Sequence, residues 1–185
     1  MKTNLLTLGL LSLANLFGAC ASAPSDAAIG TSSAPVSAVG EASPSAELLG
    51  TWAFVLSASD VAAPIRARCA DEFAGDTTKA AACWNEVASE AAREKIRFAT
   101  DGAGHTLWTS FGSEGAKEVV FIEVPVELAA DGPGRVLAKV RGAAKGDHAS
   151  QFAKANVNVM RIEVVDARTI AMNDPKKGRL VFSKE

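Results

Sequence analysis

The side chains that most often catalyse reactions or bind metals are few in this chain and are not grouped. The two histidines, His105 and His148, lie far apart without HxxxH or HExxH spacing, so both are predicted to be solvated. Glu123 and Glu127 share the polar face of one predicted strand, about 13 Å apart, which exceeds the roughly 5–9.5 Å of a glycosidase pair. We therefore expect no enzyme activity, no metal site and no cofactor.

Residues 1–19 have the pattern of an export signal. Lys2 supplies a positive charge, a leucine-rich apolar run follows, and the small residues Gly18 and Ala19 come directly before Cys20. The apolar run of about fifteen residues is shorter than the roughly 20 that a membrane-spanning helix needs. Residues 1–19 are therefore predicted to be a signal peptide.

The sequence LFGAC at residues 16–20 resembles the lipobox of bacterial lipoprotein precursors, although Phe17 stands where leucine is usual. The resemblance implies that Cys20 is acylated, becomes the first mature residue and anchors the protein in a membrane. The residues after Cys20 are not the Asp that favours inner-membrane retention in enterobacteria, so the resemblance implies the outer membrane, facing the periplasm or the cell surface. The competing interpretation is ordinary secretion, with residues 19–21 as an A-x-A cleavage site.

Residues 20–46 are predicted to be a disordered linker. Ala, Ser, Pro and Gly fill 20 of the 26 positions after Cys20, and the only charges are Asp26 and Glu41. Such a composition buries too little apolar surface to offset chain entropy. A flexible chain of this length spans about 30 Å, which suits a tether between a lipid anchor and a folded domain.

The remaining residues, 47–185, are predicted to form one mainly β domain. The 185-residue chain has room for one domain, its 48 % hydrophobic content excludes a disordered protein, and its net charge of −2 gives no basis for nucleic-acid binding. Eight segments alternate apolar and polar residues and are separated by Asp-Gly and Pro-Gly turns, which favours an antiparallel meander closing into a barrel. The predicted strands are Leu48–Leu56, Glu94–Thr100, His105–Phe111, Lys117–Leu128, Arg135–Arg141, Val157–Val165, Arg168–Asn173 and Arg179–Lys184.

A pair of helices is predicted between the first and second strands. The first helix begins at Pro64 or is capped earlier by Asp60, and Asp76 caps the second. An antiparallel pair turning near Gly75 brings Cys69 and Cys83 level. Because Cys20 is acylated or removed and the chain is exported, these two cysteines are predicted to form a disulfide, with two buried thiols as the alternative.

The tripeptide Gly50-Thr51-Trp52 opens the first predicted strand, and G-x-W in this place resembles the lipocalin superfamily. The resemblance implies that Trp52 closes one end of the barrel beneath a basic residue from a late strand, Arg179 first and Lys184 second. It also implies that the connection after the first strand overhangs the open end, so the two helices would form a lid or a plug.

Two main functions remain open at this point, and a hydrolase is the third and weakest alternative. The first is a lipid-anchored envelope protein whose lipocalin-like barrel binds a small apolar ligand. The second is a non-enzymatic envelope lipoprotein with a filled barrel that acts through protein contacts, as an inhibitor, chaperone or assembly factor. An apolar cavity of roughly 300 Å³ or more favours the first.

Overall fold

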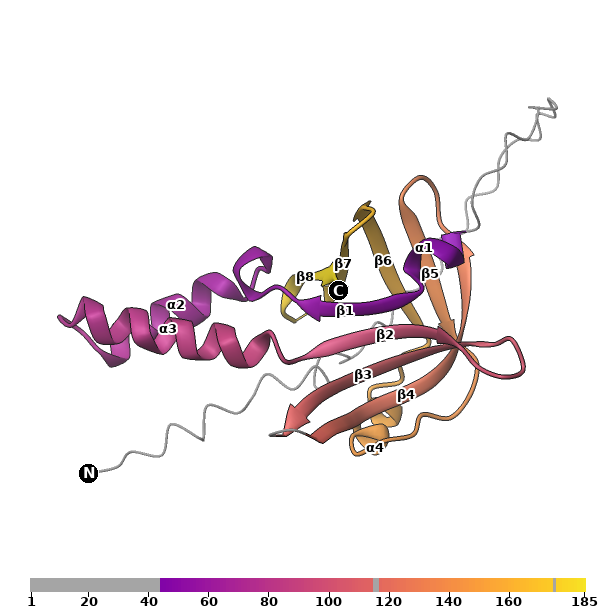
Figure 1. Ribbon diagram of the computed structural model, residues 1–185, viewed down its shortest axis with the longest axis horizontal. Helices are drawn as coiled ribbons and strands as arrows, with labels where there is room; N and C mark the ends of the chain where they lie inside the picture. Colours follow the sequence, from indigo (N-terminus) through magenta and orange to yellow (C-terminus); the bar gives the residue numbers. More distant parts are fainter. Residues whose placement is uncertain (1–43, 115–116, 175) are drawn as a thin grey trace.

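The strands of the folded region form a closed barrel. The computed structural model describes residues 44–114, 117–174 and 176–185, in which eight strands pair antiparallel in sequence order and the last strand returns to the first (Figure 1). The predicted eight-stranded meander is therefore confirmed. The strands are β1 (Gly50–Phe54), β2 (Lys95–Thr100), β3 (Thr106–Glu114), β4 (Lys117–Ala130), β5 (Arg135–Val140), β6 (Val159–Asp166), β7 (Thr169–Asp174) and β8 (Gly178–Lys184).

The predicted helix pair lies between β1 and β2, as α2 (Ala62–Glu72) and α3 (Thr77–Ala91). The Asp76 carboxylate accepts a hydrogen bond of 3.0 Å from the amide of Lys79, which caps α3 as expected. The expected start of α2 is wrong. The helix begins two residues before Pro64, and Asp60 does not cap it.

Asp60 has a different partner. Its Oδ2 accepts a 2.7 Å hydrogen bond from the backbone amide of Arg179, at the start of β8. Asp60 therefore ties the chain before α2 to the barrel. An exposed carboxylate can either cap a helix or accept a hydrogen bond from a distant backbone amide. The spacing of residues in the sequence does not show which of these two contacts forms.

Three shorter helical segments are not anticipated by the sequence pattern. They are α1 (Pro44–Leu48), the 3₁₀ helix η3 (Leu56–Ala58) and α4 (Ala149–Lys154). Because α1 begins at Pro44, the last residues assigned to the linker already belong to the fold. Residues 1–43, including Cys20, lie outside the described part of the chain.

Every strand contributes apolar side chains to the interior of the barrel. On β4, Ile122, Val124 and Val126 alternate inward and are between 0 and 4 % exposed. Burying one such side chain contributes roughly 1.5–3 kcal/mol, so the alternating pattern is what drives closure. The largest fully buried side chains are Trp52, Trp108, Phe98 and Phe182.

The barrel has two different ends. We call the end where β1 begins the base, and the end where β1 finishes the mouth. Because the strands alternate in direction, the α2–α3 hairpin, the segment that contains α4 and the β7–β8 turn all lie at the mouth, whereas α1 lies at the base. The hairpin extends outward from the barrel (Figure 1).

The segment that contains α4 closes part of the mouth. Phe152 of α4 is 3 % exposed and stacks on Trp108 at a ring-centroid distance of 6.1 Å. Before α4, Gly146 has φ +103°, and a Cβ atom there would lie 2.6 Å from the Phe121 carbonyl oxygen. A glycine is therefore required where this segment crosses β4.

Candidate functional site

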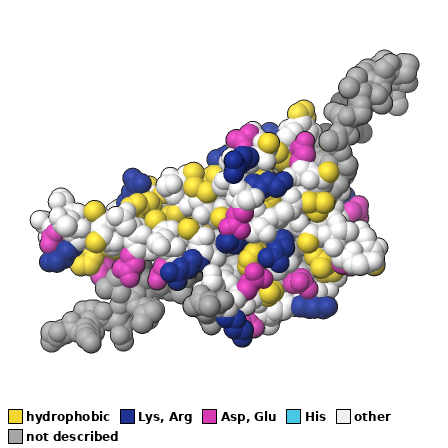
Figure 2. Space-filling model, viewed as in Figure 1, with side chains coloured by type: hydrophobic (Ala, Val, Ile, Leu, Met, Phe, Trp, Pro, Cys, Tyr) yellow, Lys and Arg dark blue, Asp and Glu magenta, His cyan; other side chains and the backbone are white. Residues whose placement is uncertain are grey.

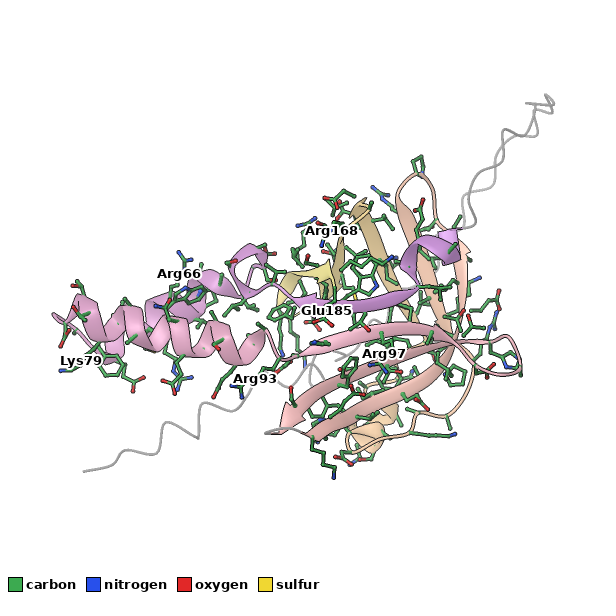
Figure 3. The ribbon with its side chains drawn as sticks, viewed as in Figure 1. Arg66, Lys79, Arg93, Arg97, Arg168 and Glu185 are labelled. Carbon is green, nitrogen blue, oxygen red and sulfur yellow. A yellow bond between two sulfur atoms is a disulfide. The ribbon has the colours of Figure 1, made fainter. Side chains whose placement is uncertain are left out.

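Cys69 and Cys83 form the predicted disulfide. The S–S distance is 2.02 Å, the Cα atoms are 5.9 Å apart, and both residues are buried between α2 and α3. A second contact joins the same helices, since the Arg66 guanidinium of α2 lies 4.3 Å from the centroid of the Trp84 ring of α3. In Figure 3, Arg66 projects from α2 on the hairpin. The hairpin is therefore held together covalently and by packing.

The G-x-W residues lie at the base of the barrel. Trp52 is 1 % exposed, and its Nε1–H donates a 2.9 Å hydrogen bond to the Leu48 carbonyl oxygen of α1. Gly50 has φ +128°, and a Cβ atom there would lie 3.1 Å from Cε of Lys184. The glycine is thus needed both for its backbone conformation and for the close approach of the lysine.

The basic residue over Trp52 is Lys184, and the expectation that Arg179 lies there is wrong. Lys184 is opposite Trp52 in the β1–β8 register, and its Nζ lies 5.0 Å from the ring centroid. Arg179 is at the other end of β8, where its Nε lies 3.3 Å from Glu163. The base therefore has the expected contact between a tryptophan and a basic side chain, and the basic residue is Lys184, the second of the two candidates.

The histidines do not form a site together. His105 is exposed and its Nδ1 lies 3.2 Å from Asp101, whose pKa is lowered mainly by a hydrogen bond from the His105 backbone amide. His148 is only half-buried rather than fully solvated, and it stacks on Phe121 at 5.3 Å. Across the described ranges, no three His, Cys, Asp or Glu side chains are grouped so as to hold a metal ion.

An apolar groove lies between the hairpin and the mouth of the barrel. Its volume is about 410 Å³. Figure 2 shows hydrophobic side chains along the hairpin and its junction with the barrel. The groove is lined by residues that lead out of β1 and by facing sides of both helices: Phe54, Leu56, Val61, Pro64, Ile65, Arg68, Cys69, Glu72, Cys83, Val87, Glu90, Ala91 and Glu94.

The helix directions place the lining residues along the groove. Since α2 runs outward from the barrel and α3 runs back, Glu72 lies toward the hairpin tip, and Glu90 and Ala91 lie toward the barrel. The disulfide and Val87 lie between these two ends. The groove therefore has an apolar centre with an acidic side chain toward each end.

A partly buried polar cluster adjoins the barrel end of the groove. Glu94 and Asp174 are 6 % and 7 % exposed, and Asp174 Oδ1 accepts 2.8 Å hydrogen bonds from the amides of Lys176 and Lys177. Desolvation lowers the pKa of the half-buried Lys177 amine, and the charges of Asp174 and Glu94 oppose that shift. Lys177 and the two carboxylates therefore belong to one electrostatic cluster.

The groove itself is not anticipated by the sequence pattern. The expectation was a lid or plug, but the hairpin meets the barrel at one end, through η3, and extends outward. In the described residues, no helix has the length and apolarity needed to cross a bilayer. The sequence signal that could have indicated the groove is the apolar helix faces around Ile65, Cys69 and Val87. Such faces more often pack into a hydrophobic core than line a groove.

Comparisons with protein-family models, with curated proteins and with solved structures found no match for this chain.

Proposed function

We propose that this chain is a lipid-anchored cell-envelope protein that binds a small apolar ligand in the groove at the mouth of its barrel. The groove is the observation that carries the proposal. Its volume of about 410 Å³ falls within the roughly 300–1,000 Å³ of small-molecule sites, and most of its lining residues are apolar. The disulfide supports the same function because it fixes two walls of the groove before a ligand arrives.

The proposed ligand site is the groove rather than the interior of the barrel. The G-x-W start and the closed barrel resemble lipocalins, whose open end receives the ligand. In this chain, large side chains such as Trp108, Phe152 and Phe182 occupy the interior. Among the described lining residues, Phe54 is the one that belongs to a strand of the barrel, so a ligand in the groove leaves the core packing intact.

A second candidate is an envelope protein that acts through contacts with another protein. The large buried side chains inside the barrel and the projecting hairpin favour it. Native mass spectrometry of protein taken from its own cells separates the two. A co-purified apolar molecule supports ligand binding, whereas a clean apo mass with a crosslinked partner supports protein contacts.

The groove assignment predicts that Ala91→Trp weakens binding of the neutral probe N-phenyl-1-naphthylamine by at least about tenfold. Ala91 lines the groove, and an indole there would occupy the space of the ligand. Titration followed by probe fluorescence measures the affinity. The matched control is Ala81→Trp, an exposed position of α3 outside the groove, which should leave the affinity unchanged. Equal affinities in the two variants would exclude the groove.

The lipid anchor predicts that Cys20→Ser moves the protein from the membrane fraction to the soluble fraction. Two or more acyl chains, at about 0.8 kcal/mol per buried CH₂, are what hold such a protein in lipid. Fractionation followed by immunoblotting measures the distribution. Cys83→Ser leaves the anchor in place and should stay with the membrane. Retention of Cys20→Ser in the membrane would contradict the anchor.

A further inference from the structure

We propose that the groove prefers ligands that join an apolar body to a cationic group. This inference rests on the proposed function, because it names the ligand class of the same groove. The preference follows from the charges that surround the apolar walls.

Carboxylates outnumber cations along the groove. Among its described lining residues, Glu72, Glu90 and Glu94 are acidic, and Arg68 is the basic one. Glu72 and Glu90 are exposed, and in the part of the chain that the structure describes neither forms an ion pair within 4.0 Å. They are therefore available to a ligand at either end of the groove.

The polar cluster behind the groove does not reverse this balance. The charges of Glu94 and Asp174 both act on the Lys177 amine, so this cluster sets one cation against two carboxylates. With Arg68, Glu72 and Glu90 included, four carboxylates stand against two cations, which leaves an excess of two negative charges. Because Glu72 and Glu90 are exposed, the attraction of this excess for a cation is screened by salt and is strongest at low ionic strength.

The test compares three detergents that share one decyl chain and differ in the head group. Decyltrimethylammonium, decyl maltoside and decyl sulfate are titrated as monomers into the purified full-length protein by calorimetry. We expect the cationic detergent to bind at least about tenfold more tightly than the anionic one, with the neutral one between them. Raising the salt from about 0.01 M to about 0.15 M should narrow this preference, because the Debye length falls from about 30 Å to about 8 Å.

Three sets of variants assign the preference to the groove. Glu72→Gln with Glu90→Gln should reduce the cationic preference by about threefold or more, since each exposed charge contributes modestly. The matched control is Asp71→Asn with Glu86→Gln, which makes the same change in net charge at exposed positions of the same helices outside the groove. Arg68→Gln should increase the preference for the cationic detergent, because it removes a positive charge from the groove. Partial unfolding would weaken binding in general and would not produce this increase.

The outcomes separate this inference from the proposed function. If the three detergents bind equally well, the charge preference is wrong and the groove remains a ligand site. If the control pair reduces the preference as much as the Glu72 and Glu90 pair does, the preference belongs to the overall charge and the inference is wrong. If none of the detergents binds, both the inference and the proposed function are overturned.

Discussion

Trp52→Ala is expected to lower the free energy of unfolding by about 3–5 kcal/mol. The indole is 1 % exposed, its Nε1–H is bonded to the Leu48 carbonyl oxygen, and Lys184 lies over its ring. Its removal leaves a cavity at the base, an unpaired carbonyl and a lysine without its aromatic contact. Chemical denaturation followed by circular dichroism measures the loss.

Two further variants separate the parts of this effect. Trp52→Phe keeps an aromatic ring but loses the hydrogen bond, so its cost should be about 1–3 kcal/mol. Trp84→Ala removes a half-buried indole from the hairpin and should cost about 1 kcal/mol, because that site is open to solvent on one side. If Trp52→Ala costs no more than Trp84→Ala, Trp52 does not close the base.

Removal of the disulfide, by Cys69→Ala with Cys83→Ala, is expected to destabilise the hairpin by about 3 kcal/mol. The two cysteines are separated by 14 positions, and opening a loop of this size returns about that much conformational freedom to the unfolded hairpin. The hairpin joins the barrel through η3 and extends outward from it, so we expect it to open while the barrel stays folded. Hydrogen exchange should show amides of α2 and α3 losing protection by about a hundredfold.

Barrel amides supply the internal control for this experiment. The amides of β4 and β5 should keep their protection, because the strands are paired on both sides and lie far from the hairpin in the strand order. Equal loss of protection in the hairpin and in these strands would show that the two unfold as one unit. Binding of the neutral probe should also weaken, since two walls of the groove then move independently.

The barrel was predictable because its signals are local. Inward alternation along β4, Gly-containing turns such as residues 131–134 and the helix cap at Asp76 depend on neighbours a few positions apart. The disulfide was predictable for a similar reason, since one tight turn at Gly75 brings Cys69 and Cys83 level.

The errors concern contacts between distant parts of the chain. Arg179 and Lys184 both lie on β8, roughly 17 Å apart along the strand, and only the closing β1–β8 register decides which one lies over Trp52. Asp60 was a reasonable helix cap until its bond to the Arg179 amide was visible. The segment that contains α4 was missed because one aromatic residue, Phe152, carries its packing.

The groove was not predictable for a different reason. The apolar faces around Ile65 and Val87 have the same spacing whether they cover a core or border a space. The space is bordered by both helices and by η3, and the contacts among these elements are tertiary contacts. From the sequence alone, the acidic residues Glu72 and Glu90 on those faces are interpreted as ordinary solvated side chains. Their place beside a groove depends on how the two helices pair.

The placement of α1 determines at which end of the barrel an N-terminal anchor would join the fold. The part of the chain that the structure describes begins at Pro44, at the opposite end of the barrel from the hairpin. If Cys20 carries the proposed lipid anchor, the anchored segment would join the fold at the base, the opposite end of the barrel from the proposed ligand groove.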